Sequence, residues 1–148
     1  MLSIHSTSVE LEGVPTEIMV QGFADRILVL VTQMGKVGNL IQASIPLTTP
    51  LLSAHDEESN SLTTEFPTPP AAIQLTPLLG GASSEHLQTL HSLYAAQIAT
   101  IIWIEEAKKM AVDRKSVVVG IALRREGNAD ERKTFHGVMN HLYRLVNS

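Results

Sequence analysis

The sequence contains no cysteine, and this absence removes three kinds of chemistry. Disulfide bonds, thiolate catalysis and cysteine-based zinc sites all need a thiol group that the chain lacks. An excess of basic residues is also missing, because 11 Lys and Arg residues stand against 15 Asp and Glu residues, for a formal net charge of -4. Nucleic acid and anionic membranes attract proteins with a concentrated basic surface, so neither is an expected partner.

Long apolar runs are missing as well. No run comes near the roughly 20 residues that span a bilayer, and the first residues lack the basic flank and apolar segment of a secretory signal. We therefore expect neither membrane insertion nor secretion, but a location in the cytoplasm, with the nucleus as a second compartment. The length of 148 residues, 44% of them hydrophobic and 18% charged, is typical of one globular domain.

The first third of the chain is predicted to form strands separated by turns. Residues 27 to 31 (Ile-Leu-Val-Leu-Val) are apolar at every position, which is typical of a central strand covered on both faces. Gly13 allows the first turn, and Gly35 and Gly38 bracket a later one. The expected strands are Ile4–Leu11 at an exposed edge, Thr16–Phe23, Ile27–Val31 and Leu40–Ile45. The simplest arrangement of these four strands is an antiparallel meander.

The rest of the chain is predicted to alternate between helix and strand. Residues 46–70 contain five prolines and little apolar periodicity, which indicates a long mobile loop. The elements expected after it are a short strand at Ala71–Leu78, a helix capped by Ser83 or Ser84 and running to about Ala111, a central strand at Lys115–Leu123 and a terminal helix from Asn128. This order predicts an α+β fold in a single domain over residues 1–148, with an antiparallel sheet of about six strands flanked by two α-helices.

We assign no catalytic, cofactor-binding or metal-binding residue from the sequence. His86 and His91 are five positions apart, as are His136 and His141, so each pair would point to different sides of a helix and would not chelate. The segment around Gly35 and Gly38 lacks the Gly-Lys-Ser/Thr ending of a phosphate loop. These two glycines are therefore better explained as turn residues than as phosphate-binding residues.

Two groups of residues are candidates for binding another protein. Trp103 lies beside Ile101 and Ile102, which makes the helix apolar around more of its circumference than one buried stripe requires. Core packing is the alternative explanation for these three residues. The run Asp56, Glu57 and Glu58 lies in the proline-rich segment, where it forms either a solvated loop or a docking loop for a basic surface.

One stretch also carries a family resemblance. The residues Gly13-Val14-Pro15-Thr16, followed by the run from Ile27 to Leu40 (Ile-Leu-Val-Leu-Val-Thr-Gln-Met-Gly-Lys-Val-Gly-Asn-Leu), resemble the corresponding region of the proteasome assembly chaperone 3 family. This match covers about residues 12 to 46. Beyond it, the resemblance rests on the order of elements: a Leu-Gly step at Leu79-Gly80, a helix, an apolar strand and a terminal helix.

The resemblance implies a small non-enzymatic chaperone that needs no cofactor. Members of the family pair with a similarly folded partner, proteasome assembly chaperone 4, and the heterodimer binds alpha-type subunits, particularly the fifth, to promote assembly of the 20S alpha ring. Homodimerisation of the isolated chain is left open. The chain departs from the family in the length of its acidic proline-rich loop and in extra residues between Glu105 and Arg114.

Two other functions compete with this one. A generic dimerising adaptor of a trafficking or signalling complex would also use a sheet edge and a helix as its interface. A small hydrolase or transferase would need a histidine and a carboxylate that converge within hydrogen-bond reach in a pocket.

Overall fold

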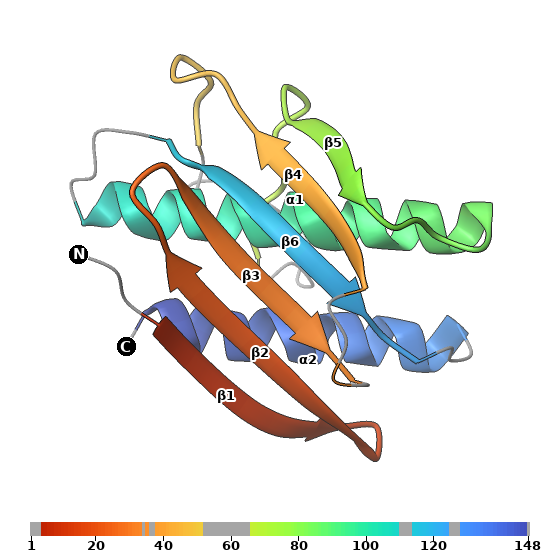
Figure 1. Ribbon diagram of the computed structural model, residues 1–148. Helices are drawn as coiled ribbons and strands as arrows, with labels where there is room; N and C mark the ends of the chain where they lie inside the picture. The colour runs from red at the N-terminus through yellow and green to blue at the C-terminus, as the bar shows by residue number, and fades with distance from the viewer. Residues whose placement is uncertain are drawn as a thin grey trace, which may run out of the picture.

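A computed structural model describes residues 4–33, 35, 38–51, 66–109, 114–124 and 128–147. These residues form six strands and two helices (Figure 1). In chain order the elements are β1 (Ile4–Leu11), β2 (Val14–Gly22), β3 (Arg26–Thr32), β4 (Asn39–Ser44), β5 (Gln74–Leu79), α1 (Glu85–Lys108), β6 (Ser116–Ala122) and α2 (Asn128–Val146). The predicted α+β fold, with about six mostly antiparallel strands and two helices, is confirmed.

The six strands form one sheet in the order β1-β2-β3-β6-β4-β5. All neighbours are antiparallel except β3 and β6, which run parallel. The predicted four-strand meander is therefore wrong at its last step, because β6 lies between β3 and β4. The reason is burial: every residue of β6 after Ser116 is buried, and a central position surrounds this apolar strand with neighbours on both sides.

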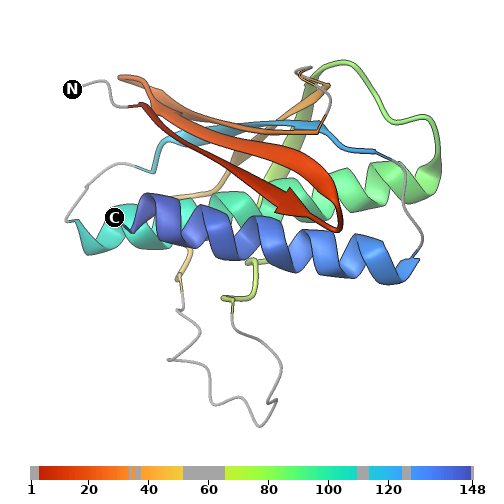
Figure 2. The same cartoon turned by 90° about the horizontal axis from the view of Figure 1, so that it is seen from below.

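Both helices pack against the same face of the sheet (Figure 2). On that face Ile27, Val29 and Val31 of β3 are buried in the core together with residues of both helices. The alternate residues Leu28 and Leu30 are only half-buried. Of the two covers predicted for β3, the described chain supplies one, because no described helix lies over the second face.

The first hairpin is closed by a two-residue turn. Leu11 pairs with Val14, and the two residues between them have positive φ angles of 50° at Glu12 and 77° at Gly13. A turn with two positive φ angles matches the twist of the strands that it joins, and glycine adopts such an angle without a steric cost. The predicted turn at Gly13 is confirmed, and it fixes the register along β1.

Helix α1 begins after Ser84, whose Oγ accepts a hydrogen bond from the Leu87 backbone N–H at 3.2 Å. Such a cap satisfies one of the N–H groups that the first turn of a helix leaves free. Ser84 was one of the two predicted caps, and the helix ends at Lys108 rather than near Ala111. In α2, Val138, Met139 and Leu142 are fully buried, as the predicted apolar face requires.

Candidate partner interface

The three apolar residues proposed as a partner interface lie in the core of this chain. Ile101, Ile102 and Trp103 are 1%, 2% and 2% exposed, and the Trp103 indole Nε1–H donates to the Lys115 carbonyl oxygen at 2.8 Å. Core packing accounts for their contacts in the single chain. Their part in pairing stays a prediction that a single chain does not test.

The acidic run at Asp56, Glu57 and Glu58 lies outside the described residues. Its two described flanks lie outside the helices and strands, and Leu51 and Phe66 on these flanks pack against the core. The proposed docking role of the three acids therefore stays a prediction.

An apolar strip crosses the sheet on the face away from the helices. The pairing register places Met19 opposite Leu30, Leu30 opposite Gly120, Gly120 opposite Leu40, and Leu40 opposite Leu79. Directly opposite residues point to the same face of a sheet, so this row runs across five strands. We call this surface the open face and define its apolar centre as Met19, Leu28, Leu30, Leu40, Leu79 and Val118.

The open face combines this apolar centre with a polar margin. Met19, Leu28, Leu30 and Leu40 are half-buried, and Leu79 at the end of the row is 65% exposed. The row beside it carries amides at Gln21 and Gln42, with Leu28 and Val118 between them. An apolar centre with polar residues around it is the usual composition of a protein–protein interface. The open face is thus the strongest candidate binding surface in the described residues.

The sequence contains a signal for this surface. Residues 27 to 31 and 117 to 119 are apolar on both sides of their strands. This pattern predicts that both faces of the sheet are covered, and it does not say which chain supplies each covering layer. The structure places the covering layer on one side only, so the second side of β3 and β6 is apolar without a described element of this chain above it.

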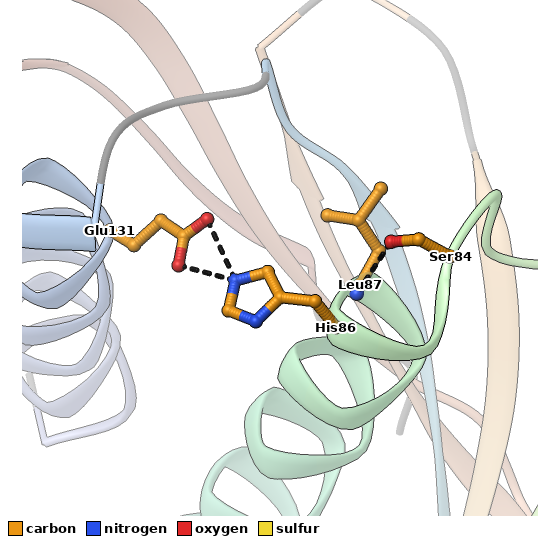
Figure 3. A network of polar contacts seen from close by, with 4 residues as sticks. All are labelled: Ser84, His86, Leu87 and Glu131. Atoms are coloured by element: carbon orange, nitrogen blue, oxygen red, sulfur yellow. Dashed lines mark hydrogen bonds and ion pairs between the residues drawn. The ribbon is translucent and has the colours of Figure 1, made fainter.

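The two helices are joined at their first turns by a histidine and a carboxylate (Figure 3). His86 Nε2 of α1 lies 2.8 Å from Glu131 Oε2 and 3.1 Å from Glu131 Oε1 of α2. The His86 side chain is 61% exposed, and the cavity beside Glu131 measures only about 20 Å³, room for about one water molecule. The pair links the first turns of the two helices, and the cavity beside it is smaller than the substrate pocket that a hydrolase would need.

A second cavity, of about 90 Å³, lies where the carboxyl ends of both helices meet the sheet. It is lined in part by Ile102 and Glu105 of α1, His5 of β1 and Leu145 of α2. Sites for small-molecule ligands usually measure roughly 300 to 1,000 Å³, so this cavity is too small for a typical cofactor. Glu105 is 3% exposed there, and its carboxylate accepts a hydrogen bond from Lys108 at 3.0 Å.

The described residues contain no group of three or more metal-ligating side chains that converge on one point. None of the helices in them has the length and hydropathy needed to cross a membrane.

Comparisons with known proteins give one informative result. No protein-family model matches the chain, and no curated protein matches it. Four chains of solved structures do match. One of them belongs to the crystal structure of a novel chaperone complex for yeast 20S proteasome assembly, with a TM-score of 0.51 and 13% sequence identity over 95% of this chain and 98% of that chain. At this identity the likeness is one of fold: the chain has the fold of a protein in a yeast proteasome assembly chaperone complex.

Proposed function

We propose that this chain is a non-enzymatic chaperone that pairs with a similarly folded partner and promotes assembly of the 20S proteasome alpha ring by binding alpha-type subunits. Two observations support the proposal. The first is the likeness of fold to a chain of a yeast proteasome assembly chaperone complex, which extends over almost the whole of both chains. The second, on which the proposed pairing rests, is the apolar open face that no described part of this chain covers.

Pairing through the open face follows from the physics of sheets. Two sheets stack about 10 Å apart when the side chains of their facing surfaces are apolar and interdigitate. A partner with the same fold would carry its own helices on one face and leave the other face free. Stacking the two free faces removes Leu28, Leu30 and their neighbours from water, at roughly 25 cal/mol for each Å² of apolar surface buried. The helices then lie on the outside of the pair.

A chaperone of this kind acts by differential affinity and needs no bond-making residue. It stabilises an assembly intermediate because it binds the intermediate more tightly than the finished particle. A subunit that arrives later and occupies the same space would release it. We expect the partner to be like proteasome assembly chaperone 4, the bound subunit to be of alpha type, particularly the fifth, and the complex to form in the cytoplasm.

Affinity purification of the tagged chain from a native extract, followed by mass spectrometry, tests the function. The proposal expects recovery of a small protein of similar fold together with alpha-type proteasome subunits. Recovery of components of a trafficking or signalling complex, without proteasome subunits, would instead support a dimerising adaptor and overturn the proposal.

A pair of leucine variants tests the open face. Leu30→Ser removes the centre of the apolar row, whereas Leu93→Ser makes the same change at a leucine of α1 that is 55% exposed and lies outside the open face. We expect Leu30→Ser to weaken pairing about tenfold or more, as a central interface residue does, and Leu93→Ser to leave the affinity unchanged. Equal affinities for Leu30→Ser and the wild-type protein, in folded samples, would remove the open face from the interface.

A further inference from the structure

The two edges of the sheet differ in how well they are protected against pairing with another chain. Edge strand β5 has six residues, contains Pro77, and its register with β4 shifts between Leu40 and Ile41. Proline, short length and irregular register are the usual means by which an edge is made unsuitable for strand addition. Edge strand β1 has eight residues in regular register with β2 and contains no proline, glycine or lysine. Only β1 therefore presents a long regular edge.

The hairpin turn determines which main-chain groups of β1 face outward. A two-residue turn closes on a hydrogen-bonded pair, here Leu11 and Val14, and such pairs alternate along an antiparallel ladder. Val9, Thr7 and His5 therefore direct their N–H and C=O groups toward β2. The opposite groups face away from the sheet, at Ile4, Ser6, Ser8 and Glu10. Pro15 agrees with this register, because it lies opposite Glu10, where its missing N–H is not needed by the ladder.

These four outward residues are all exposed, and Ile4 is 62% exposed. Among the described residues no strand lies beyond β1, since β1 is the first strand in the sheet order. Unpaired main-chain groups in a regular strand form a template for another strand. We propose that the outer edge of β1 binds an extended segment of another polypeptide, which adds to the sheet as an antiparallel seventh strand.

The side chains of β1 specify the chemistry of this segment. On the open-face side, Ser6 and Ser8 favour hydroxyl-bearing neighbours and Glu10 favours a basic residue opposite it. On the helix side, Val9 packs against the core and Leu11 is buried against α2, where a Cβ added at Gly137 would lie 2.6 Å from Leu11 Cδ2. An added strand would therefore place β-branched apolar residues on this side. The fitting segment alternates Val or Ile with Thr or Ser and begins with Lys or Arg.

A synthetic peptide, acetyl-Lys-Val-Thr-Val-Thr-Val-Thr-amide, serves as the probe in a titration of the isotopically labelled chain followed by NMR. In the proposed register the lysine lies opposite Glu10 and the threonine N–H groups face β1. We expect chemical-shift changes and slower amide exchange at Ser6, Ser8 and Glu10. N-methylation of the three threonines should abolish these effects, whereas N-methylation of the three valines, whose N–H groups face solvent, should preserve them.

A matched pair of proline variants tests the same edge from the side of the protein. Ser8→Pro removes an outward N–H and should abolish peptide binding with little change in melting temperature, because proline is tolerated on the solvent side of an edge strand. Thr7→Pro removes an N–H that faces β2 and should lower the melting temperature.

Three outcomes would overturn the proposal. The first is equal binding of the two N-methylated peptides, and the second is a set of shift changes confined to β5 or to the open face. The third is undiminished peptide binding by folded Ser8→Pro. If Ser8→Pro does not fold, the two N-methylated peptides still decide the question with the wild-type chain.

Discussion

The indole N–H of Trp103 donates to the main-chain carbonyl of Lys115 at 2.8 Å and so connects α1 to the residue just before β6. The Trp103 residue is 2% exposed. Trp103 therefore combines a large buried apolar surface with a satisfied polar atom, as buried tryptophans usually do.

We expect Trp103→Ala to lower the free energy of unfolding by about 3–5 kcal/mol, because it leaves a cavity and an unpaired carbonyl. Trp103→Phe should cost less, since most of the ring volume remains. Leu93→Ala, at an exposed position of the same helix, is the control and should cost about 0.5 kcal/mol or less. Urea denaturation measures all three variants. A folded Trp103→Ala protein as stable as the wild type would contradict the structural role.

Stability should depend on pH through His91. Burial lowers the pKa of His91 below its ordinary value of 6.5, and Asn39 Nδ2 lies 3.1 Å from His91 Nδ1. The unfolded chain therefore binds a proton at His91 more readily than the folded chain, so stability is complete above pH 6.5 and falls as the pH decreases below it. Urea denaturation between pH 5 and pH 8 should show this loss. His91→Gln should reduce the slope, whereas His5→Gln, at an exposed position, should retain it.

Two glycines with similar positive φ angles should respond very differently to alanine. Gly38 has a φ of 70°, and a Cβ there would lie 2.1 Å from the Ile121 carbonyl oxygen; Gly13 has a φ of 77° and open space around it. Gly13→Ala should cost about 1 kcal/mol for the strained backbone alone. Gly38→Ala should carry the same backbone cost and lower the free energy of unfolding by about 1–3 kcal/mol more, because the added methyl group overpacks against Ile121. Thermal unfolding compares the two variants, and equal costs would show that the strand ends near Gly38 move apart easily.

Neutralising the acidic run tests its proposed docking role. The triple variant Asp56→Asn, Glu57→Gln and Glu58→Gln should weaken capture of alpha-type subunits and reduce the salt dependence of that capture, because charge pairs are screened by salt. The matched control is Glu12→Gln with Glu85→Gln and Asp130→Asn, which removes three charges from exposed positions outside the open face and the outer edge of β1. Unchanged capture with an unchanged salt dependence would show that the run is only a solvated segment.

Local features of the fold were predictable because neighbouring residues determine them. The cap at Ser84 depends on a hydroxyl one position before the helix, and the turn at Gly13 depends on a positive φ angle. The position of β6 was not predictable in the same way. Its parallel pairing with β3 joins residues about 90 positions apart, as between Val29 and Val119, and no local pattern encodes that contact.

The candidate interface was predictable only in part, for a related reason. The unbroken apolar run of β3 shows that Leu28 and Leu30 need an apolar neighbour, but it does not say whether that neighbour belongs to the same chain. The sequence pattern around Trp103 is also ambiguous, because an apolar excess on a helix is expected both for core residues and for interface residues. The three-dimensional arrangement shows that this chain covers one face of the sheet and that Trp103 is buried within the single chain.

The place of β6 also has a consequence for the order of folding. Strands β1, β2 and β3 form one ladder and β4 with β5 forms another, and the two ladders have no mutual hydrogen-bonded pairing except through β6. The described residues before β6 can therefore build two separate β units but not the sheet. Closure of the sheet needs β6, which pairs with both units, so it depends on contacts of long sequence separation.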